Sequence, residues 1–282
     1  MTVTRRTLTA SLARLGAALV GLGLMAPGHG ASAQTLDRIK QRGVLTVGVN
    51  TDYRPFGFLD PSGAIVGMEP DLAKDMADQL HVKLQMVPVQ AANRMEFLRQ
   101  GRIDLVLASL SYNPQRAKVV GMVEPAYYDG GTALLARKSA NLRSWGDLRD
   151  KPVCGTQGAY YNRPVAEKYG ATIVAFATST EAENALLNGS CVGYVEDSGM
   201  LSGVLASGDA KWRDYDLPLP VEDTQPWMAA VPLDERDAAF GRQVSDVIAS
   251  WHRSGKLIAV SEAWHLPVTE FLKQMHAKYS QQ

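Results

Sequence analysis

The sequence predicts an α/β fold built from two similar lobes, each a mostly parallel sheet flanked by helices. Short apolar runs without polar alternation recur along the chain, a pattern typical of strands covered on both faces. Helical stretches separate these runs, so strands and helices alternate. The alternation stops near residue 130 and then begins again, which indicates a second lobe.

The first set of elements has the order β-α-β-α-β. We predict strands over 44–49, 82–87 and 103–108, and helices over 71–80 and 93–99. The first helix is indicated by Leu72, Met76 and Leu80, which are spaced four apart with acidic residues off that stripe. Gly101 ends the second helical stretch.

The second set repeats this order. We predict strands over 153–155, 172–176 and 192–195, and helices over 162–169 and 181–187. Two further helical stretches, 236–251 and 260–264, give the end of the chain something to pack against a sheet. The predicted organisation is a first lobe over 34–130, a second lobe over 131–226, and a return to the first lobe over 227–282.

The amino terminus has the pattern of an export signal. Arg5 and Arg6 precede an apolar run from Leu15 to Ala26, and small residues before Gln34 predict cleavage near Ala33. This run is shorter than the roughly 20 residues that span a bilayer. The paired arginines leave both general secretion and twin-arginine export open. We therefore predict an exported protein.

Charge and cysteine content exclude several classes of function. Residues 1–33 hold three of the 29 basic side chains and none of the 29 acidic ones, so the remainder has 26 against 29 and no nucleic-acid signature. The two cysteines, Cys154 and Cys191, are either a disulfide or two buried thiols. Neither has a partner at zinc-ligand spacing, and no cofactor motif is present, so we predict no metal and no cofactor.

Polar residues follow the predicted strands at their carboxyl ends. Ligands of open parallel sheets bind beside the carboxyl ends of the strands, and this strand-end rule selects four candidate segments. The segments are 50–53, 109–113, 155–160 and 196–198. Together they carry hydroxyls, an aromatic ring, an amide and acids, a set suited to a small polar molecule.

Several charged residues have both a functional and a structural interpretation. Asn113 and Pro114 favour a helix start that places Arg116 in the first turn, where a cation opposes the helix dipole unless an acid is near. That acid is either a ligand carboxylate or a surface side chain. Asp197 ends a strand and either holds an ammonium group or caps the next segment. Arg94 either reaches the cleft or is solvated.

Common enzyme signatures are absent from the sequence. It contains no Gly-x-Ser-x-Gly, Walker loop, Gly-x-Gly-x-x-Gly or His-Glu-x-x-His pattern. No histidine after residue 33 falls in a candidate cleft segment, and the remaining acids for proton transfer are Asp52, Glu69 and Glu196. We therefore predict a binding protein rather than an enzyme.

An ordered series of segments resembles the polar amino-acid-binding proteins of bacterial ABC importers, which are solute-binding proteins of family 3. The likeness runs from Leu36 to about Trp264. It rests on residues 48–56, Gly67-Met-Glu-Pro-Asp-Leu72, Asn93-Arg94 with Leu98-x-x-Gly101-x-x-Asp104, Ser109 to Arg116, Glu124-Pro-Ala-Tyr127, and 189–197. The resemblance implies a type II periplasmic-binding clamp, with two lobes joined by two crossing strands.

The resemblance also implies ligand roles. Arg116 and Ser111 take the α-carboxylate, Ser109 and Asp197 take the α-ammonium, and Tyr53 packs on the ligand side chain. The full implied set of ligand-binding residues is Asn50, Tyr53, Arg94, Ser109, Leu110, Ser111, Arg116, Gly158, Tyr160 and Asp197.

The resemblance implies an amino-acid ligand more clearly than it implies which amino acid is bound. Arg94 resembles an arginine that aspartate- and glutamate-selective members aim at the ligand side chain, which favours an acidic or amide ligand. Asn50 stands where such members can have another arginine, and Ser179 stands near a position where they can have histidine. Family members often have Gly-Thr-Thr where this chain reads Gln157-Gly158-Ala-Tyr160.

The predicted function is capture of a polar L-amino acid and its delivery to a membrane ABC permease, by a monomer. The first alternative is an exported cyclohexadienyl dehydratase on the same scaffold, with Glu196 or Asp197 as its general acid. The second is an accessory or sensor module that kept the clamp and lost transport.

Overall fold

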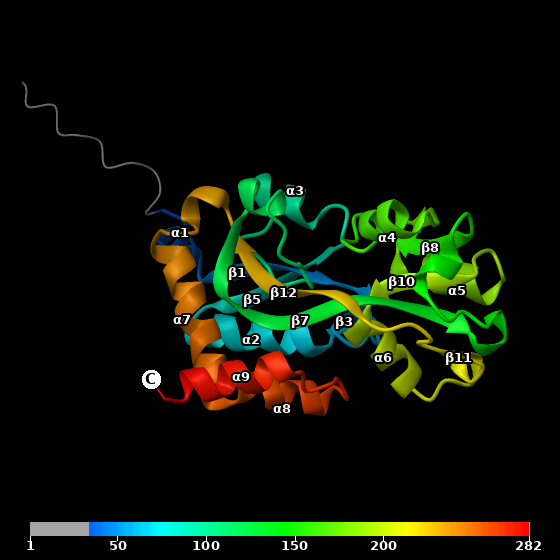
Figure 1. The fold of residues 1–282 in the computed structure, drawn as a ribbon. Coiled ribbons are helices and arrows are strands. Elements are labelled where there is room, and N and C mark those ends of the chain that lie inside the picture. Colours follow the sequence, from blue (N-terminus) through cyan, green and yellow to red (C-terminus); the bar gives the residue numbers. More distant parts are fainter. Residues whose placement is uncertain (1–33, 282) are drawn as a thin grey trace, which may run out of the picture. The chain divides into compact units, whose positions relative to one another are not determined.

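The computed structural model describes residues 34–281, with side chains from residue 35 (Figure 1). The predicted signal peptide and its cleavage point near Ala33 lie outside the described residues. Within 34–281, no helix has both the length and the apolar character needed to cross a bilayer. The same residues belong to one compact unit.

A mixed sheet of nine strands runs through both lobes. Three parallel strands form its first-lobe side: β5 (Lys83–Val89), β1 (Val44–Asn50) and β6 (Leu105–Val106). Three parallel strands form its second-lobe side: β10 (Gly193–Asp197), β8 (Pro152–Thr156) and β9 (Thr172–Phe176). These groups match the two predicted β-α-β-α-β units.

Two long antiparallel strands connect the groups, β7 (Gly121–Arg137) and β12 (Glu222–Val231). The carboxyl end of β12 pairs with β6 and with the start of β7, and the far end of β7 pairs with β10. The sheet is therefore continuous across both lobes. This confirms the predicted fold class, a two-lobed clamp joined by two strands.

The helices of the first lobe come from both ends of the chain. They are α1 (Gln34–Arg42), α2 (Met68–Gln79), α3 (Arg94–Arg99), α7 (Ala239–Ser254), α8 (Lys256–Ala263) and α9 (Glu270–Tyr279). The C-terminal helices α7 and α9 contact β7 and each other, and Figure 1 shows them beside the first-lobe strands. A small sheet, β2 (Asp52–Tyr53), β3 (Gly57–Leu59) and β4 (Ile65–Val66), lies between β1 and α2 in the chain.

The second lobe is smaller and contains a disulfide. Its helices are α4 (Asn162–Tyr169), α5 (Ser179–Leu187) and α6 (Ser198–Ala206), and the short β11 (Tyr215–Asp216) pairs with β7. Cys154 of β8 is bonded to Cys191, which precedes β10. The two cysteines, which the sequence left as either a disulfide or two buried thiols, therefore form a disulfide. It joins positions 37 residues apart in the sequence.

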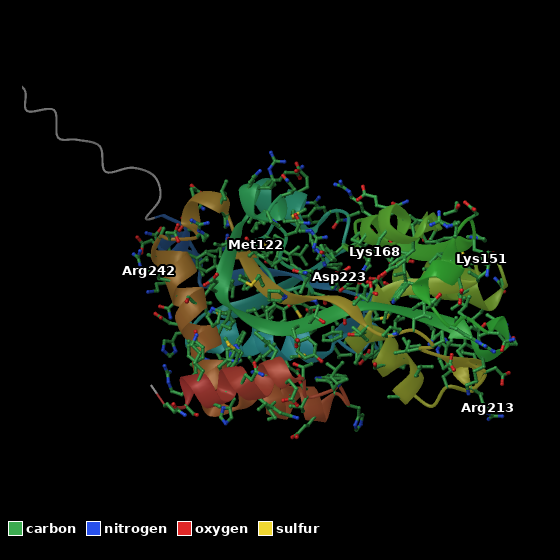
Figure 2. All side chains as sticks on the ribbon, viewed as in Figure 1. Met122, Lys151, Lys168, Arg213, Asp223 and Arg242 are labelled. Carbon is green, nitrogen blue, oxygen red and sulfur yellow. A yellow bond between two sulfur atoms is a disulfide. The ribbon has the colours of Figure 1, made fainter. Side chains whose placement is uncertain are left out.

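The sequence patterns located most elements but missed several. β6 spans only 105–106 rather than the predicted 103–108. The family resemblance implied two crossing strands, but the local pattern gave no bounds for β7 and β12, because Pro125, Gly130 and Gly131 interrupt the apolar pattern of β7. Labelled basic residues such as Lys151, Arg213 and Arg242 lie at the edge of the molecule in Figure 2. The predicted lobe boundaries remain a prediction.

Candidate functional site

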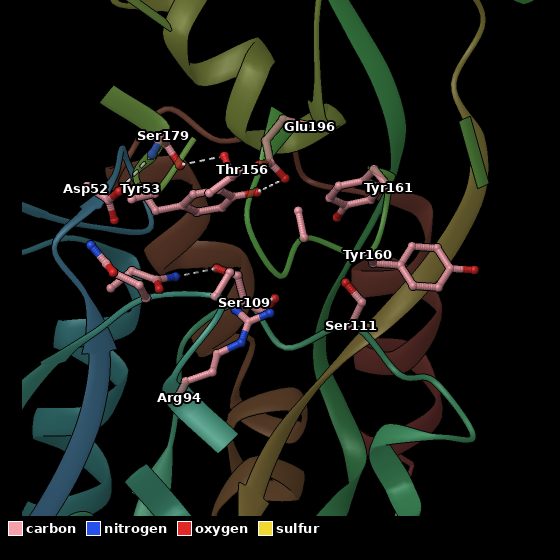
Figure 3. Close-up of a pocket in the computed structure, with 15 residues that line it drawn as sticks. Asp52, Tyr53, Arg94, Ser109, Ser111, Thr156, Tyr160, Tyr161, Ser179 and Glu196 are labelled. Atoms are coloured by element: carbon pink, nitrogen blue, oxygen red, sulfur yellow. Dashed lines mark hydrogen bonds between the residues drawn. The ribbon is translucent and has the colours of Figure 1, made fainter. Parts of the chain in front are cut away.

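A small cavity lies where the carboxyl ends of the parallel strands of both lobes meet (Figure 3). Its residues follow or end β1, β5 and β6 on one side and β8, β9 and β10 on the other, the position expected for open parallel sheets. They are Asn50, Asp52, Tyr53, Gln90, Ala91, Arg94, Ser109, Ser111, Thr156, Ala159, Tyr160, Tyr161, Ala177, Ser179 and Glu196.

The cavity is closed in this conformation. Its volume is about 20 Å³, and roughly 10–15 Å³ on this measure holds one water molecule. An amino acid is much larger than that. Ligand entry therefore requires the lobes to separate, which is the motion that a hinge of two strands permits.

Arg94 supplies the positive charge of the first-lobe wall. It is the first residue of α3 and is 4% exposed. One terminal nitrogen donates to the carbonyl oxygens of Ala108 and Ser109, while Nε is buried and has no partner among the described residues. No ion pair joins Arg94 to any carboxylate of residues 34–281. Burial lowers the pKa of this guanidinium.

Ser109 is held on the same wall by a buried network. Its backbone has φ of 50°, in the left-handed region that non-glycine residues seldom adopt. Glu69 Oε1 accepts hydrogen bonds from Ser109 N at 2.5 Å, from Ser109 Oγ at 2.8 Å and from the Tyr127 hydroxyl at 2.7 Å. Asn50 Nδ2 donates to Ser109 Oγ at 3.4 Å. Glu69 thus holds Ser109 in place through these hydrogen bonds. Burial raises the pKa of the Glu69 carboxyl.

Glu196 supplies the acid of the second-lobe wall. It is 2% exposed and lies in β10. Its Oε1 accepts from the Tyr53 hydroxyl at 3.1 Å, and its Oε2 accepts from the Tyr194 hydroxyl at 3.2 Å. Burial raises the pKa of the Glu196 carboxyl. No lysine or arginine forms an ion pair with it in the described part of the chain.

Asp197, the next residue, has a different environment. Its side chain caps α6, with Oδ1 accepting from Gly199 N at 2.7 Å and from Met200 N at 3.3 Å. Oδ2 accepts from the Tyr161 hydroxyl at 2.8 Å. The carboxylate is fully buried and is not among the residues that line the cavity.

Three hydrogen bonds join the lobes around the cavity. Ser179 N, at the start of α5, donates to Asp52 Oδ2 at 2.9 Å. The Tyr53 hydroxyl donates to Glu196 at 3.1 Å. Arg116 donates to the carbonyl oxygen of Gly158 at 2.9 Å. These contacts hold the two cavity walls together in this conformation.

Arg116 and Gly158 lie beside the cavity rather than on its wall. Arg116 begins a short 3₁₀ turn, and Asn113 Oδ1 accepts from Gln115 N at 2.7 Å and from Arg116 N at 3.4 Å, close to the predicted helix start. Its guanidinium donates to Ser111 O at 3.0 Å as well as to Gly158 O, and burial lowers its pKa to about 10. Gly158 has φ of 77°, and a Cβ there would lie 2.7 Å from backbone atoms of Ala92, so only glycine fits this lobe contact.

The structure brings together most, but not all, of the predicted site residues. Six line the cavity: Asn50, Tyr53, Arg94, Ser109, Ser111 and Tyr160. Leu110 is buried in an apolar cluster of the first lobe, and Arg116, Gly158 and Asp197 lie outside the lining set. Among the lining residues not predicted as ligand contacts, Asp52, Thr156 and Glu196 fall within the segments that the strand-end rule selected, whereas Gln90 and Ser179 do not.

Comparison with known proteins identifies the family. The model of the bacterial extracellular solute-binding proteins, family 3, matches residues 45–267. The chain therefore belongs to this family of extracellular solute-binding proteins, and its relatives are amino-acid-binding components of ABC importers.

Two relatives illustrate the range of ligands. The glutamate/aspartate import solute-binding protein of Salmonella typhimurium is 24% identical, over 92% of this chain and 88% of its own. The ABC transporter glutamine-binding protein GlnH of Bacillus subtilis is 26% identical, over 82% of this chain and 84% of its own.

Solved structures show the same fold. Holo ArgBP from T. maritima has a TM-score of 0.71 and 28% identity, covering 81% of this chain and 99% of its own. An ancestral amino acid-binding protein, AncCDT-1, described as a precursor of cyclohexadienyl dehydratase, has a TM-score of 0.73 and 27% identity, covering 82% of this chain and 99% of its own.

Proposed function

We propose that this protein is a periplasmic receptor that captures a polar L-amino acid in the cavity between its lobes and presents the closed form to an ABC permease. The ligand is bound unchanged. Closure follows from contacts that one small molecule makes to both walls, because only a ligand that favours the closed state shifts the equilibrium. A monomer is sufficient for this mechanism.

The observation that carries the proposal is the unpaired Arg94 guanidinium on the cavity wall. The buried Glu69 carboxyl acts on Arg94 through space but forms no ion pair with it among the described residues, so an anionic ligand in the cavity would offset part of the cost of burying this cation. The fork of a guanidinium matches a carboxylate, which every amino acid carries. Glu196 on the opposite wall is likewise buried and forms no ion pair with a basic side chain of residues 34–281. The cavity thus complements a zwitterion.

The polar lining supports a ligand with an acidic or amide side chain. Asn50, Ser109, Ser111 and Thr156 offer an amide and hydroxyls around the cavity, beside tyrosine and alanine side chains. Two of the relatives are named for glutamate/aspartate and for glutamine. We expect the strongest binding from L-glutamate, L-aspartate, L-glutamine or L-asparagine.

A thermal-shift screen of the twenty L-amino acids tests the proposal. A ligand at a hundredfold excess over its Kd stabilises the native state by about 2.7 kcal/mol, which is a measurable rise in Tm. Isothermal titration then gives the Kd of each hit, and Arg94→Met should weaken binding by about a hundredfold. Lys151→Met, a charge change in the second lobe outside the cavity, is the control. Absence of any hit would contradict the proposal.

The dehydratase alternative has one favourable observation, the raised pKa of a cavity carboxyl, Glu196. A carboxyl that keeps its proton can act as a general acid. AncCDT-1, one of the structural neighbours, is itself described as a precursor of such an enzyme. Incubation with prephenate and with arogenate, followed by detection of aromatic product, distinguishes the two. Turnover abolished by Glu196→Gln would replace the receptor proposal.

A further inference from the structure

Glu235 is a buried acid of the first lobe that does not line the cavity between the lobes. It ends the short 3₁₀ turn η6 (Leu233–Glu235), which precedes α7, and it is 2% exposed. Its Oε1 accepts from the backbone amide of Thr35, the second residue of α1, at 3.3 Å. Its Oε2 is buried and has no hydrogen-bond partner among the described residues. One oxygen of this carboxylate is therefore available to a further donor.

The Glu235 carboxylate also has no counter-ion in the described part of the chain. No basic side chain there forms an ion pair with it. Arg236, the next residue, pairs with Asp237 instead, and Arg38 of α1 donates to the Thr35 hydroxyl. Burial of a carboxylate is costly unless a charge of opposite sign accompanies it. The free oxygen therefore favours a positively charged donor close to the start of α1.

The backbone on both sides of this carboxylate is fixed by packing. Glu235 N donates to Pro232 O at 2.9 Å, and Ala238 N donates to Glu235 O at 3.1 Å. A Cβ on Gly241 of α7 would lie 2.4 Å from Glu235 O, so the first turn of α7 lies directly against η6. The helix α1 contacts α7 as well, and Figure 1 shows the two side by side. Glu235 is thus held at the start of α1 by the fold itself.

Removal of the predicted signal peptide would create a cation at this position. The sequence predicts cleavage near Ala33, and α1 begins at Gln34. A chain that starts at Gln34 has an α-amine there, which is mostly protonated below about pH 8. Consecutive Cα atoms are about 3.8 Å apart, so this ammonium lies one residue from the amide that Glu235 already binds.

We propose that Glu235 is a binding site for the mature protein's own α-ammonium, with Oε2 accepting from Gln34 N while Oε1 accepts from Thr35 N. An ammonium alone at the first residue of α1 is disfavoured by the helix dipole, and a carboxylate beside it removes that conflict. In the precursor the same nitrogen is a neutral peptide amide. The ion pair therefore forms only after cleavage, and it joins α1 to the turn that begins α7.

The first test identifies the terminus. The full chain is produced with its own signal in a bacterial host and recovered after export, and its first residue is determined by intact mass and by N-terminal sequencing. We expect Gln34 with a free amine. A start at a different residue overturns the proposal, because the ammonium is then not next to Thr35. A terminus blocked by cyclisation of Gln34 overturns it as well, because no ammonium exists.

A double-mutant cycle then separates the ion pair from simple capping of α1. Glu235→Gln removes the charge but keeps an acceptor oxygen for Thr35 N. Insertion of a glycine and a serine between Ala33 and Gln34 moves the new ammonium two residues away from Glu235. Asp234→Asn is the matched control, because it removes the same charge at the neighbouring, exposed position. Each protein is melted at about pH 6.5, where an α-amine is charged.

We expect Glu235→Gln to lower the Tm by about 4 °C or more in the normal chain, and by less than half as much in the chain with the insertion. Asp234→Asn should change the Tm little in either chain. Pairing keeps the amine charged to higher pH, so the effect of Glu235→Gln should persist at about pH 8 and shrink toward about pH 10, as the amine loses its proton.

Two results of the melts overturn the proposal. An equal loss of Tm in the normal and the extended chain, unchanged between the two pH limits, means that Glu235 only caps α1. No loss in the normal chain means that the carboxylate holds no ammonium. Either result leaves the proposed receptor function untouched, because the cavity between the lobes takes no part in this site.

Discussion

The two walls of the cavity are held in different ways. On the first-lobe wall, Arg94 and Ser109 are fixed by bonds to their own lobe, through Ala108, Glu69 and Tyr127. On the second-lobe wall, Glu196 is bonded to Tyr194 of its own lobe and to Tyr53 across the cleft, and the start of α5 is bonded to Asp52 across the cleft. We therefore expect Arg94 and Ser109 to keep their bonds when the clamp opens, whereas Glu196 should lose one of its partners.

The lobes also differ in how they are stabilised. The first lobe gains α7, α8 and α9 from the end of the chain, and its apolar core is correspondingly large. The second lobe is smaller and includes the Cys154–Cys191 bridge. Small domains bury a smaller fraction of their surface and more often depend on a covalent link. The comparison suggests that the second lobe is the less stable and more adjustable part.

Removal of the disulfide should give the largest change in the free energy of unfolding. The double variant Cys154→Ser, Cys191→Ser should lower the free energy of unfolding by about 3 to 4 kcal/mol, because the unfolded chain gains the freedom of a long loop. Urea denaturation monitored by tryptophan fluorescence measures this. Reduced wild type serves as the matched control. A loss below about 1 kcal/mol in both would contradict the view that the bridge stabilises the second lobe.

Substitution of one buried tyrosine in each lobe compares how much the hydrogen bonds near the two walls contribute to stability. Tyr127 makes two buried hydrogen bonds, to Glu69 and from Ser109 N, whereas Tyr161 makes one, to Asp197. Tyr127→Phe should cost about 2 kcal/mol of stability and Tyr161→Phe about 1 kcal/mol, because buried polar groups lose their partners. Denaturant titration of the two variants ranks them. The reverse order would show that the first-lobe network is not the more tightly coupled one.

The sequence predicted the parallel parts of the fold because those strands are continuous apolar runs. The helix over 162–169 and the strand over 172–176 have the predicted bounds. The two crossing strands were implied by the family resemblance but were not located from the local pattern, because β7 is long and contains Pro125, Gly130 and Gly131, residues that locally predict a break. Their pairing with distant strands overrides that local preference, and such pairing is not visible in a local pattern.

The sequence predicted the segments that form the site more accurately than the individual residues that line it. The strand-end rule selected the stretches that contain Asn50, Ser109 and Glu196, and applied to the strands before Gln90 and Ser179 it would have selected those as well. Strand alternation separates Glu196 from Asp197, but which of them faces inward depends on the register of β10 with β7 and β8. A sequence pattern does not contain that register.

The pH dependence of stability should include a contribution from Glu183, a carboxyl of the second lobe whose charged form is disfavoured by burial. Burial raises the pKa of Glu183, in α5, to about 7. A carboxyl whose pKa is raised by folding contributes its stability below its unfolded pKa, and the contribution is lost as pH rises toward the folded value. The Tm should therefore fall between about pH 4.5 and 7, and Glu183→Gln should flatten that fall. Glu167→Gln, at an exposed position of α4, should not.

The smallest effect is expected at the link between the lobes formed by Asp52. Its Oδ2 accepts from Ser179 N at the start of α5, where the helix dipole favours a negative charge by about 0.3–1 kcal/mol. Asp52→Asn keeps an acceptor oxygen but removes the charge, so the closed form should lose roughly that amount, and the ligand Kd should rise by a few fold. Global stability should change little, because the bond lies between lobes rather than within one. Titration calorimetry measures the Kd, and a melt of the ligand-free protein measures stability. An unchanged Kd with a lowered Tm would mean that Asp52 stabilises its own lobe, and the second wall would then depend on the first less than the crossing bonds indicate.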